Sequence, residues 1–133
     1  RDTDNISTTY QNCWAVKNGY LKDGSKGAGD GNGFKTGGSD DKLLKHNAIY
    51  KNCIAVGNVF DGFDHNSNRG SVTIYNSSAY DNGKNYSFGT TNPLEKLTIK
   101  NSSALGAFGS ITATILDVTN NSWPKVEEKS KFD

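Results

Sequence analysis

The chain has 133 residues, which is the size of one domain or of part of a larger one. Its 15 Lys and Arg residues nearly balance its 14 Asp and Glu residues, which excludes the basic charge of a dedicated nucleic-acid or acidic-membrane binder. Only 33% of the residues are hydrophobic, which argues against a large apolar core, while 6 Phe, 6 Tyr and 2 Trp argue against disorder.

No run of about 18 apolar residues occurs, so no transmembrane helix is predicted. The chain opens on the polar residue Arg1 without an initiator Met or a signal-peptide pattern, so we expect it to be processed or cut from a longer one. Gly (15 residues) and Asn (16 residues) are abundant, and both tolerate left-handed backbone conformations. This composition predicts frequent and regular turns.

A repeat runs through the chain. Its first mark is the pattern Asn-x-x-Ala, with copies 40, 24 and 25 residues apart that begin at Asn12, Asn52, Asn76 and Asn101. A second Asn follows six residues later in three copies: Asn18, Asn58 and Asn82. A Phe follows in every copy: Phe34, Phe63, Phe88 and Phe108. Short alternating segments that predict strands precede the pattern at 48–50, 72–75 and 97–100, and a weaker fifth copy covers 115–121.

A period of about 24 residues with β-branched strands, Gly and Asn corners and no helix signal predicts an all-β parallel β-helix of about five coils. The repeated Ala is expected at tight interior positions, and the repeated Asn is expected to form a ladder of stacked amides at a corner. The leucine-rich repeat is excluded because its Leu-x-x-Leu-x-Leu string is missing. We expect the β-helix to cover residues 1–122 and residues 123–133 to form a cap or tail.

The two cysteines, Cys13 and Cys53, match no zinc pattern. They occupy the same frame position in neighbouring copies, so they are expected to lie close together. Buried free thiols are favoured, and a disulfide remains the alternative if the two Cβ atoms face each other.

The long first spacing indicates two insertions, near 19–33 and 36–46, on either side of Lys35. Insertions in repeat proteins gather on the functional face, and the glycines around Lys35 would let a ligand approach the backbone closely. Asp64 follows its Phe directly, as Lys35 does, so the two are expected to be neighbours along the stack. A surface salt bridge of less than about 1 kcal/mol is the plain alternative to a functional pair.

A second concentration of polar groups lies at 61–69, one coil after Lys35. Its acid, imidazole, amide and guanidinium groups are candidate substrate-binding residues for a sugar or a carboxylate: Asp64, His65, Asn68 and Arg69. An Asn- and Gly-rich turn with a hydrogen-bonded His is the structural alternative. No residue of this chain forms a predicted metal site.

Four linked motifs resemble those of polysaccharide lyase family 9, over about residues 8–110: Gly31-Asn-Gly-Phe-Lys35-x-Gly-Gly38, Lys51-Asn-Cys-x-Ala55, Gly62-Phe-Asp-His-Asn-Ser-Asn68 and Tyr80-x-Asn-Gly-x-Asn-Tyr-Ser-Phe88. This family comprises right-handed parallel β-helix pectate lyases and related rhamnogalacturonan lyases. The resemblance implies a right-handed β-helix that cleaves pectate by β-elimination, with Lys35 as the catalytic Brønsted base.

The resemblance also implies a Ca²⁺ cofactor, held mainly by an upstream Asp-Asp-Gly-x-Asp motif that this sequence lacks. By family spacing the motif would fall just before Arg1, and Asp2 and Asp4 lie near the place without matching the pattern. The resemblance therefore implies the C-terminal part of a catalytic helix that carries the base but not the calcium ligands. Either the chain is a fragment, with an open N-terminal coil through which chains can associate, or the calcium coil is lost, which argues against activity. The implied partner is an acidic polysaccharide, pectate or rhamnogalacturonan, and the implied location is secreted or periplasmic.

β-Elimination needs a base that is neutral when it acts, and a carboxylate such as Asp64 beside Lys35 would oppose this. Calcium would acidify the proton that is removed and help to hold the sugar. The alternatives left open are a rhamnogalacturonan lyase, a non-catalytic carbohydrate-binding β-helix and a structural β-helix.

Overall fold

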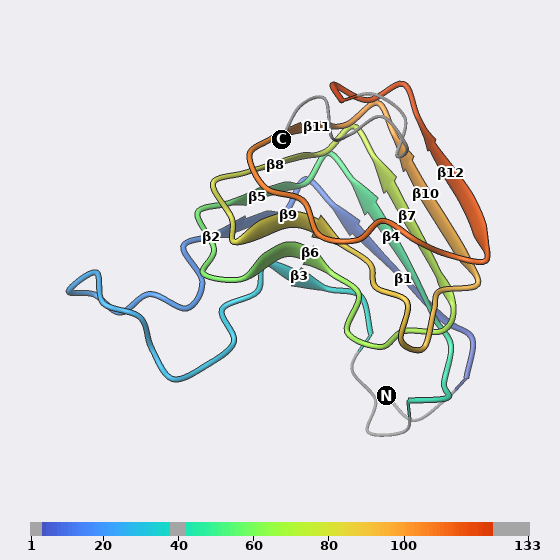
Figure 1. Cartoon of the computed structure of the whole chain (residues 1–133), viewed down its shortest axis with the longest axis horizontal. Coiled ribbons are helices and arrows are strands. Elements are labelled where there is room, and N and C mark those ends of the chain that lie inside the picture. Colours follow the sequence, from blue (N-terminus) through green and yellow to red (C-terminus); the bar gives the residue numbers. More distant parts are fainter. Residues whose placement is uncertain (1–3, 38–41, 124–133) are drawn as a thin grey trace.

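The computed structural model describes residues 4–37 and 42–123, and the strands in these ranges form three parallel sheets (Figure 1). The first sheet has the order β1 (Ile6–Gln11), β4 (His46–Lys51), β7 (Ser71–Tyr75), β10 (Lys96–Lys100) and β12 (Ile115–Thr119). The second has the order β11 (Ser103–Leu105), β8 (Ser78–Tyr80), β5 (Ile54–Val56) and β2 (Trp14–Val16). The third contains β3 (Phe34–Lys35), β6 (Asp61–Asp64) and β9 (Lys84–Ser87).

Each coil passes once through the sheets and then rises to the next layer, which makes the fold a parallel β-helix, as predicted. The strand of one coil pairs in parallel with the equivalent strand of the next, for example Lys51 with Tyr75 and Tyr75 with Lys100. The weak fifth copy is also a coil, because β12 pairs in parallel with β10. The described residues contain no helix, and so no helix that could cross a membrane.

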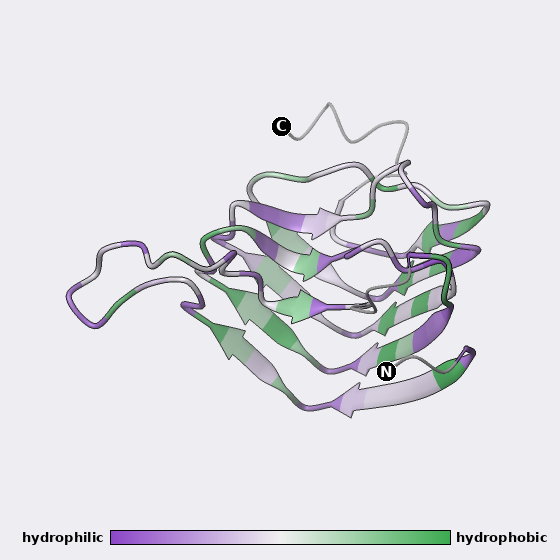
Figure 2. Cartoon of the chain, turned by 90° about the horizontal axis from the view of Figure 1, so that it is seen from below, coloured by the Kyte–Doolittle hydropathy of each residue, from purple (hydrophilic) through white to green (hydrophobic). Residues whose placement is uncertain are grey.

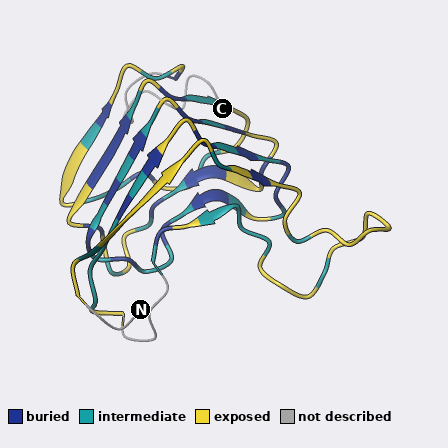
Figure 3. Ribbon diagram, turned by 180° about the vertical axis from the view of Figure 1, so that it is seen from behind, coloured by how far each residue is buried: buried dark blue, intermediate teal, exposed yellow. Residues whose placement is uncertain are grey.

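The strands alternate between inward and outward side chains, as a period of two requires. In β7, Val72 and Ile74 are fully buried, while the three residues that alternate with them are half-exposed. The hydrophobic colour accordingly concentrates on the strands (Figure 2), and the buried stretches lie mainly along the strands of the stack (Figure 3). At the tight second sheet the buried interior positions are Ala15, Ala55 and Ala79, which confirms the expected role of the repeated alanine.

The first Asn of the repeat forms an exposed corner, where two amides are bonded along the stack because Asn120 donates its side-chain amide to Oδ1 of Asn101. The corner residues after the first-sheet strands have φ between 50° and 57° and are exposed: Asn12, Asn52, Asn76, Asn101 and Asn120. Asn is suited to this position because its short polar side chain lowers the steric penalty of the left-handed region. Each coil turns sharply at this position, which explains why Asn recurs there in every copy of the repeat.

The predicted Asn ladder exists at the second Asn of the repeat. Asn82 accepts hydrogen bonds at Oδ1 from the backbone N–H of Asn58 (3.0 Å) and from its side-chain Nδ2 (2.7 Å). Asn58 in turn accepts one at Oδ1 from the N–H of Asn18 (2.9 Å). Asn58 and Asn82 are buried, so these bonds satisfy backbone groups that water cannot reach.

The interior beside the third sheet holds a stack of aromatic rings. Phe34 packs on Phe63 with ring centroids 5.1 Å apart, and Phe63 packs on Tyr86 at 5.2 Å. The frame predicted from sequence is wrong in the third coil, because Tyr86 and not Phe88 pairs with Phe63. Both aromatic residues point inward and are fully buried, so alternation alone cannot exclude a slip of two residues.

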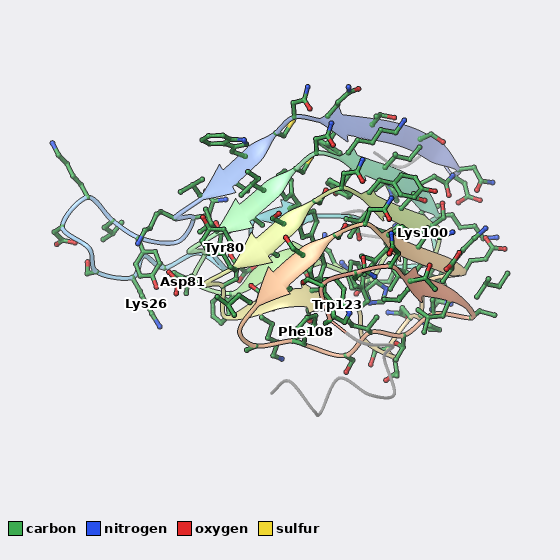
Figure 4. All side chains as sticks on the ribbon, turned by 90° about the horizontal axis from the view of Figure 1, so that it is seen from above. Lys26, Tyr80, Asp81, Lys100, Phe108 and Trp123 are labelled. Carbon is green, nitrogen blue, oxygen red and sulfur yellow. The ribbon has the colours of Figure 1, made fainter. Side chains whose placement is uncertain are left out.

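The stack ends at Trp123, the first residue of the predicted tail, which is buried. Its ring lies 5.2 Å from those of Tyr86 and Phe108, and Figure 4 labels Phe108 and Trp123 side by side. The rest of the predicted tail, 124–133, lies outside the described residues. Cys13 and Cys53 are free thiols, as favoured from sequence, and Cys53 is buried.

Candidate functional site

The outward surface of β3, β6 and β9 carries the candidate site, which we call the third-sheet face. Lys35 pairs in register with Asp64, and Asp64 with Ser87; the residues on their inner side, Phe34 and Phe63, pack in the aromatic stack. The predicted neighbourhood of Lys35 and Asp64 is therefore confirmed. Because the aromatic rings fix the strands from within, the polar side chains are held on a rigid scaffold.

The backbone of Lys35 is held on both sides. Its carbonyl accepts a hydrogen bond from the Tyr50 hydroxyl (3.2 Å), and the buried Thr36 donates its own hydroxyl to the carbonyl of His65 (2.9 Å). The side chain points outward and is 44% exposed. Lys35 therefore presents an accessible amine from a fixed main chain, which places it where it can meet a ligand on this face.

The ionic partner of Lys35 is Asp30, which sequence reasoning did not single out. Its Oδ2 lies 3.2 Å from the Lys35 Nζ, and its side chain is 75% exposed. Asp30 belongs to the first inserted segment, which extends away from the stack between β2 and β3 (Figure 1). The inserted loop therefore reaches back to the third-sheet face and contacts Lys35 there.

Asp64 bonds to neutral groups and makes no ion pair with Lys35 within the described ranges. Its Oδ1 accepts from the N–H of Asn66 (3.1 Å), and its Oδ2 accepts from the Nδ2 of Asn32 (3.3 Å). Burial raises the pKa of this carboxyl above its ordinary value, and the Asn66 hydrogen bond and the charge of Lys35 act against the shift. The salt bridge considered from sequence thus forms with Asp30 in place of Asp64.

His65 and Asn68 are buried and bonded within the protein. The Nε2 of His65 lies 2.7 Å from the carbonyl oxygen of Asn68. The amide of Asn68 accepts from the N–H groups of His46 and Gly70 (both 2.9 Å) and donates to the carbonyls of Thr36 (3.2 Å) and His46 (2.9 Å). Both residues therefore shape the corner beneath Asp64.

Arg69 joins two further segments at the same corner. Its Nε donates to the carbonyl of Lys42 (2.7 Å), and its guanidinium also donates to Oδ1 of Asn92. These contacts use two of the five donors that a guanidinium carries. Arg69 thus ties the second inserted segment to the loop that follows β9.

Two hollows open on the third-sheet face. The larger, of about 570 Å³, is lined by Asp30, Asn32, Val59, Phe60, Asp61, Gly83 and Lys84. The other, of about 450 Å³, is lined by Asp64, His65, Asn66, Ser67, Ser87, Gly89, Thr90, Thr91 and Ser110. Strand β6 contributes Asp61 to the first hollow and Asp64, the register partner of Lys35, to the second, so the two openings lie toward the two ends of β6; Lys35 itself lines neither.

The described residues do not fit a calcium ion. Nowhere in 4–37 and 42–123 do three or more His, Cys, Asp or Glu side chains gather in a group that could hold a metal. Asp4, one of the two residues near the expected motif, accepts a hydrogen bond from the N–H of Lys45 (2.7 Å). Asp2 lies outside the described residues.

Known proteins share this sequence and this fold. Residues 2–103 match the family described as "Pel9A-like, right handed beta helix region". Pectate lyase L of Dickeya dadantii is 41% identical over 116 residues, which are 85% of this chain and 26% of that protein. Pectate lyase PEL9 of Emericella nidulans is 39% identical over 87 residues, 63% of this chain and 21% of that protein.

A solved structure described as pectate lyase Pel9A superposes with a TM-score of 0.73 at 36% identity, over 90% of this chain and 29% of that one. The chain thus spans about a quarter of the length of the relatives it matches. The agreement confirms the right-handed parallel β-helix.

Proposed function

Because the chain belongs to the family of Pel9A-like right-handed β-helices, we propose that it supplies the Brønsted base, Lys35, of a pectate lyase that acts on a uronic-acid polysaccharide. The observation that carries the proposal is the position of Lys35: its amine is exposed on the third-sheet face, its main chain is fixed, and two hollows lie toward the two ends of the adjacent strand β6. The whole protein's substrate is proposed to be an acidic polysaccharide outside the cell, as pectate is.

The proposed reaction is a β-elimination. The neutral amine of Lys35 takes the proton from C5 of a uronate ring, the carbon next to the carboxylate. The electrons of that C–H bond form a double bond between C4 and C5, and the bond from C4 to the glycosidic oxygen breaks. The leaving oxygen takes up a proton from the solvent and Lys35 then releases its proton to the solvent, so one chain becomes two and one product end is unsaturated. No oxidant or water enters the balance.

Asp30 sets a condition on this step. The ion pair with Asp30 engages the amine that has to take the proton. The substrate must therefore displace Asp30 from Lys35. Both side chains are substantially exposed, so the pair is weak and its separation costs less than about 1 kcal/mol.

The other predicted substrate-binding residues divide into two groups. Asp64 and His65 line the second hollow, and we propose that they contact the sugar there. Asn68 and Arg69 are proposed to act indirectly, because their hydrogen bonds join the segments around that hollow. Carboxylates and amides in such a hollow match the hydroxyl groups of a sugar ring.

A non-catalytic carbohydrate-binding role is a second candidate, favoured by the ion pair with Asp30 that engages the Lys35 amine. The two functions differ in the product. The test compares the wild-type protein that carries this chain with Lys35→Gln, and measures the ultraviolet absorbance of unsaturated ends formed from polygalacturonate. The matched control is Lys51→Gln, which alters an exposed lysine on β4, away from the third-sheet face.

We expect unsaturated product from the wild type and from Lys51→Gln, and a loss of at least about a hundredfold in Lys35→Gln, the range that general base catalysis contributes. Binding of polygalacturonate without any unsaturated product in the wild type would establish the binding role and refute the lyase.

A further inference from the structure

Several residues that line the larger hollow have no role in the proposed reaction at Lys35. It contains one exposed aromatic ring (Phe60), one cation (Lys84) and two carboxylates (Asp30 and Asp61). Phe60 is 53% exposed, although the other phenylalanines of the described ranges pack inside the coils. An aromatic side chain kept in solvent at the wall of a hollow lacks a structural reason, because burying it would stabilise the fold.

The backbone around Phe60 is fixed. Its N–H donates to the carbonyl of Gly31 (3.2 Å), and its carbonyl accepts from the N–H of Lys84 (3.2 Å). Gly83 lies so close that an added Cβ would come within 2.6 Å of the Val59 carbonyl oxygen and 2.9 Å of that of Phe60. The ring therefore stands on a rigid rim, which is what a stacking platform for a ligand requires.

Lys84 is the lining cation that remains available. Its side chain makes no hydrogen bond or ion pair with any residue in 4–37 and 42–123, whereas Asp30 is paired with Lys35. Lys84 and Asp61 are register partners on β9 and β6, so the ammonium and a half-buried carboxylate lie along the same wall. The charge of Lys84 acts on the Asp61 carboxyl without forming an ion pair with it, so the hollow offers an unpaired ammonium beside groups that accept hydrogen bonds.

A uronic-acid ring combines the groups that this lining complements. Its carboxylate needs a cation, its hydroxyl groups donate to carboxylates, and the C–H face of the ring packs on an aromatic surface. The hollow also adjoins the proposed base, because Asp30 lines it and lies 3.2 Å from the Lys35 amine. A ring seated there would belong to the same polymer chain as the ring that reacts at Lys35.

We propose that the hollow between Phe60 and Lys84 is a subsite for one uronate ring of the polysaccharide, with Phe60 stacking on the ring and Lys84 binding its carboxylate. The subsite deepens the proposed lyase function and rests on it for the nature of the polymer. In this proposal, Lys84 makes the subsite bind a free uronate more tightly than its methyl ester, and Phe60 contributes affinity for the sugar ring in either form.

The test measures binding without turnover, in the protein that carries this chain with Lys35→Gln. The probes are trigalacturonate and its fully methyl-esterified form, titrated by calorimetry. In this background Phe60→Ala is expected to weaken both ligands about fivefold or more, because the stacking surface is lost for either. Lys84→Gln is expected to weaken the acid about two- to fivefold and to leave the ester unchanged.

Matched controls are Leu105→Ala, which removes a 78% exposed apolar side chain on β11, and Lys51→Gln; both should bind as the parent does. Phe60→Leu keeps apolar bulk without a ring and serves if the alanine variant fails to fold. Unchanged affinity in the Phe60 and Lys84 variants, equal loss of both ligands in Lys84→Gln, or no binding to the parent would each overturn the subsite. Retained turnover in Lys35→Gln alone would instead overturn the assignment of the base.

Discussion

Two asparagines of the same coil, six residues apart, should differ greatly in how much their substitution destabilises the fold. Asn76 is an exposed corner with φ 50°, and its side chain has no role that glycine cannot replace in the described contacts. Asn82 is a buried rung of the ladder. We predict that Asn76→Gly changes the free energy of unfolding by less than about 0.5 kcal/mol, since glycine adopts the left-handed region freely.

Asn82→Ala should be far more harmful. The Asn82 Oδ1 accepts a hydrogen bond from the buried N–H of Asn58 (3.0 Å), and its Nδ2 donates to Oδ1 of the buried Asn85 (2.9 Å). Each buried group left without a partner costs about 1–3 kcal/mol, so the two together cost about 2–6 kcal/mol. This is a large share of the roughly 5–15 kcal/mol that stabilises a domain.

The assay is urea unfolding followed by far-ultraviolet circular dichroism, with both variants compared at equal protein concentration. The predicted order of the unfolding midpoints is wild type and Asn76→Gly together, with Asn82→Ala well below. Equal midpoints for the two variants would refute the assignment of the ladder to the second Asn of the repeat.

Two further substitutions test other contacts. Asp64 has a raised pKa, so its contribution to stability is full below the ordinary value of 3.8 and is lost as pH rises through the folded-state pKa. The stability of Asp64→Asn relative to wild type should therefore increase between about pH 3 and about pH 6 in urea titrations, and a constant difference would contradict the shift. Gly62→Ala should lose about 1–3 kcal/mol, because its Cβ would lie 2.7 Å from the Asn85 carbonyl oxygen, whereas Gly89→Ala, with nothing within 4 Å, should unfold as the wild type does.

The coils could be predicted from sequence because every coil repeats the same local demands. The sharp corner needs a residue that tolerates positive φ, and the narrow second sheet needs a small inward residue. Asn52 and Ala55 meet these two demands in one coil, and Asn76 and Ala79 meet them in the next. The frame Asn-x-x-Ala is therefore visible without a structure.

The register of the third sheet was harder to predict from the sequence. Tyr86 and Phe88 are both aromatic, both inward and both fully buried, and only pairing distinguishes the one that lies over Phe63. A shift of two residues preserves the inward and outward pattern, so no hydrophobic periodicity could expose the error.

The site was predicted in part for a related reason. Lys35 and Asp64 follow their phenylalanines in the repeat, so their neighbourhood could be inferred. Asp30 sits on an inserted loop whose path the repeat does not determine, and its contact with Lys35 appears only in three dimensions. Phe60 and Lys84 come together only once the register of β6 with β9 is known.

The role of Lys35 is tested most directly by chemical rescue. Lys35→Ala in the protein that carries this chain should form unsaturated product from polygalacturonate at least about a hundredfold more slowly than the wild type. Added small primary amines should restore part of that rate, in proportion to the concentration of the neutral amine. Unsaturated product formed by Lys35→Ala at the wild-type rate, without added amine, would contradict a catalytic base at the third-sheet face.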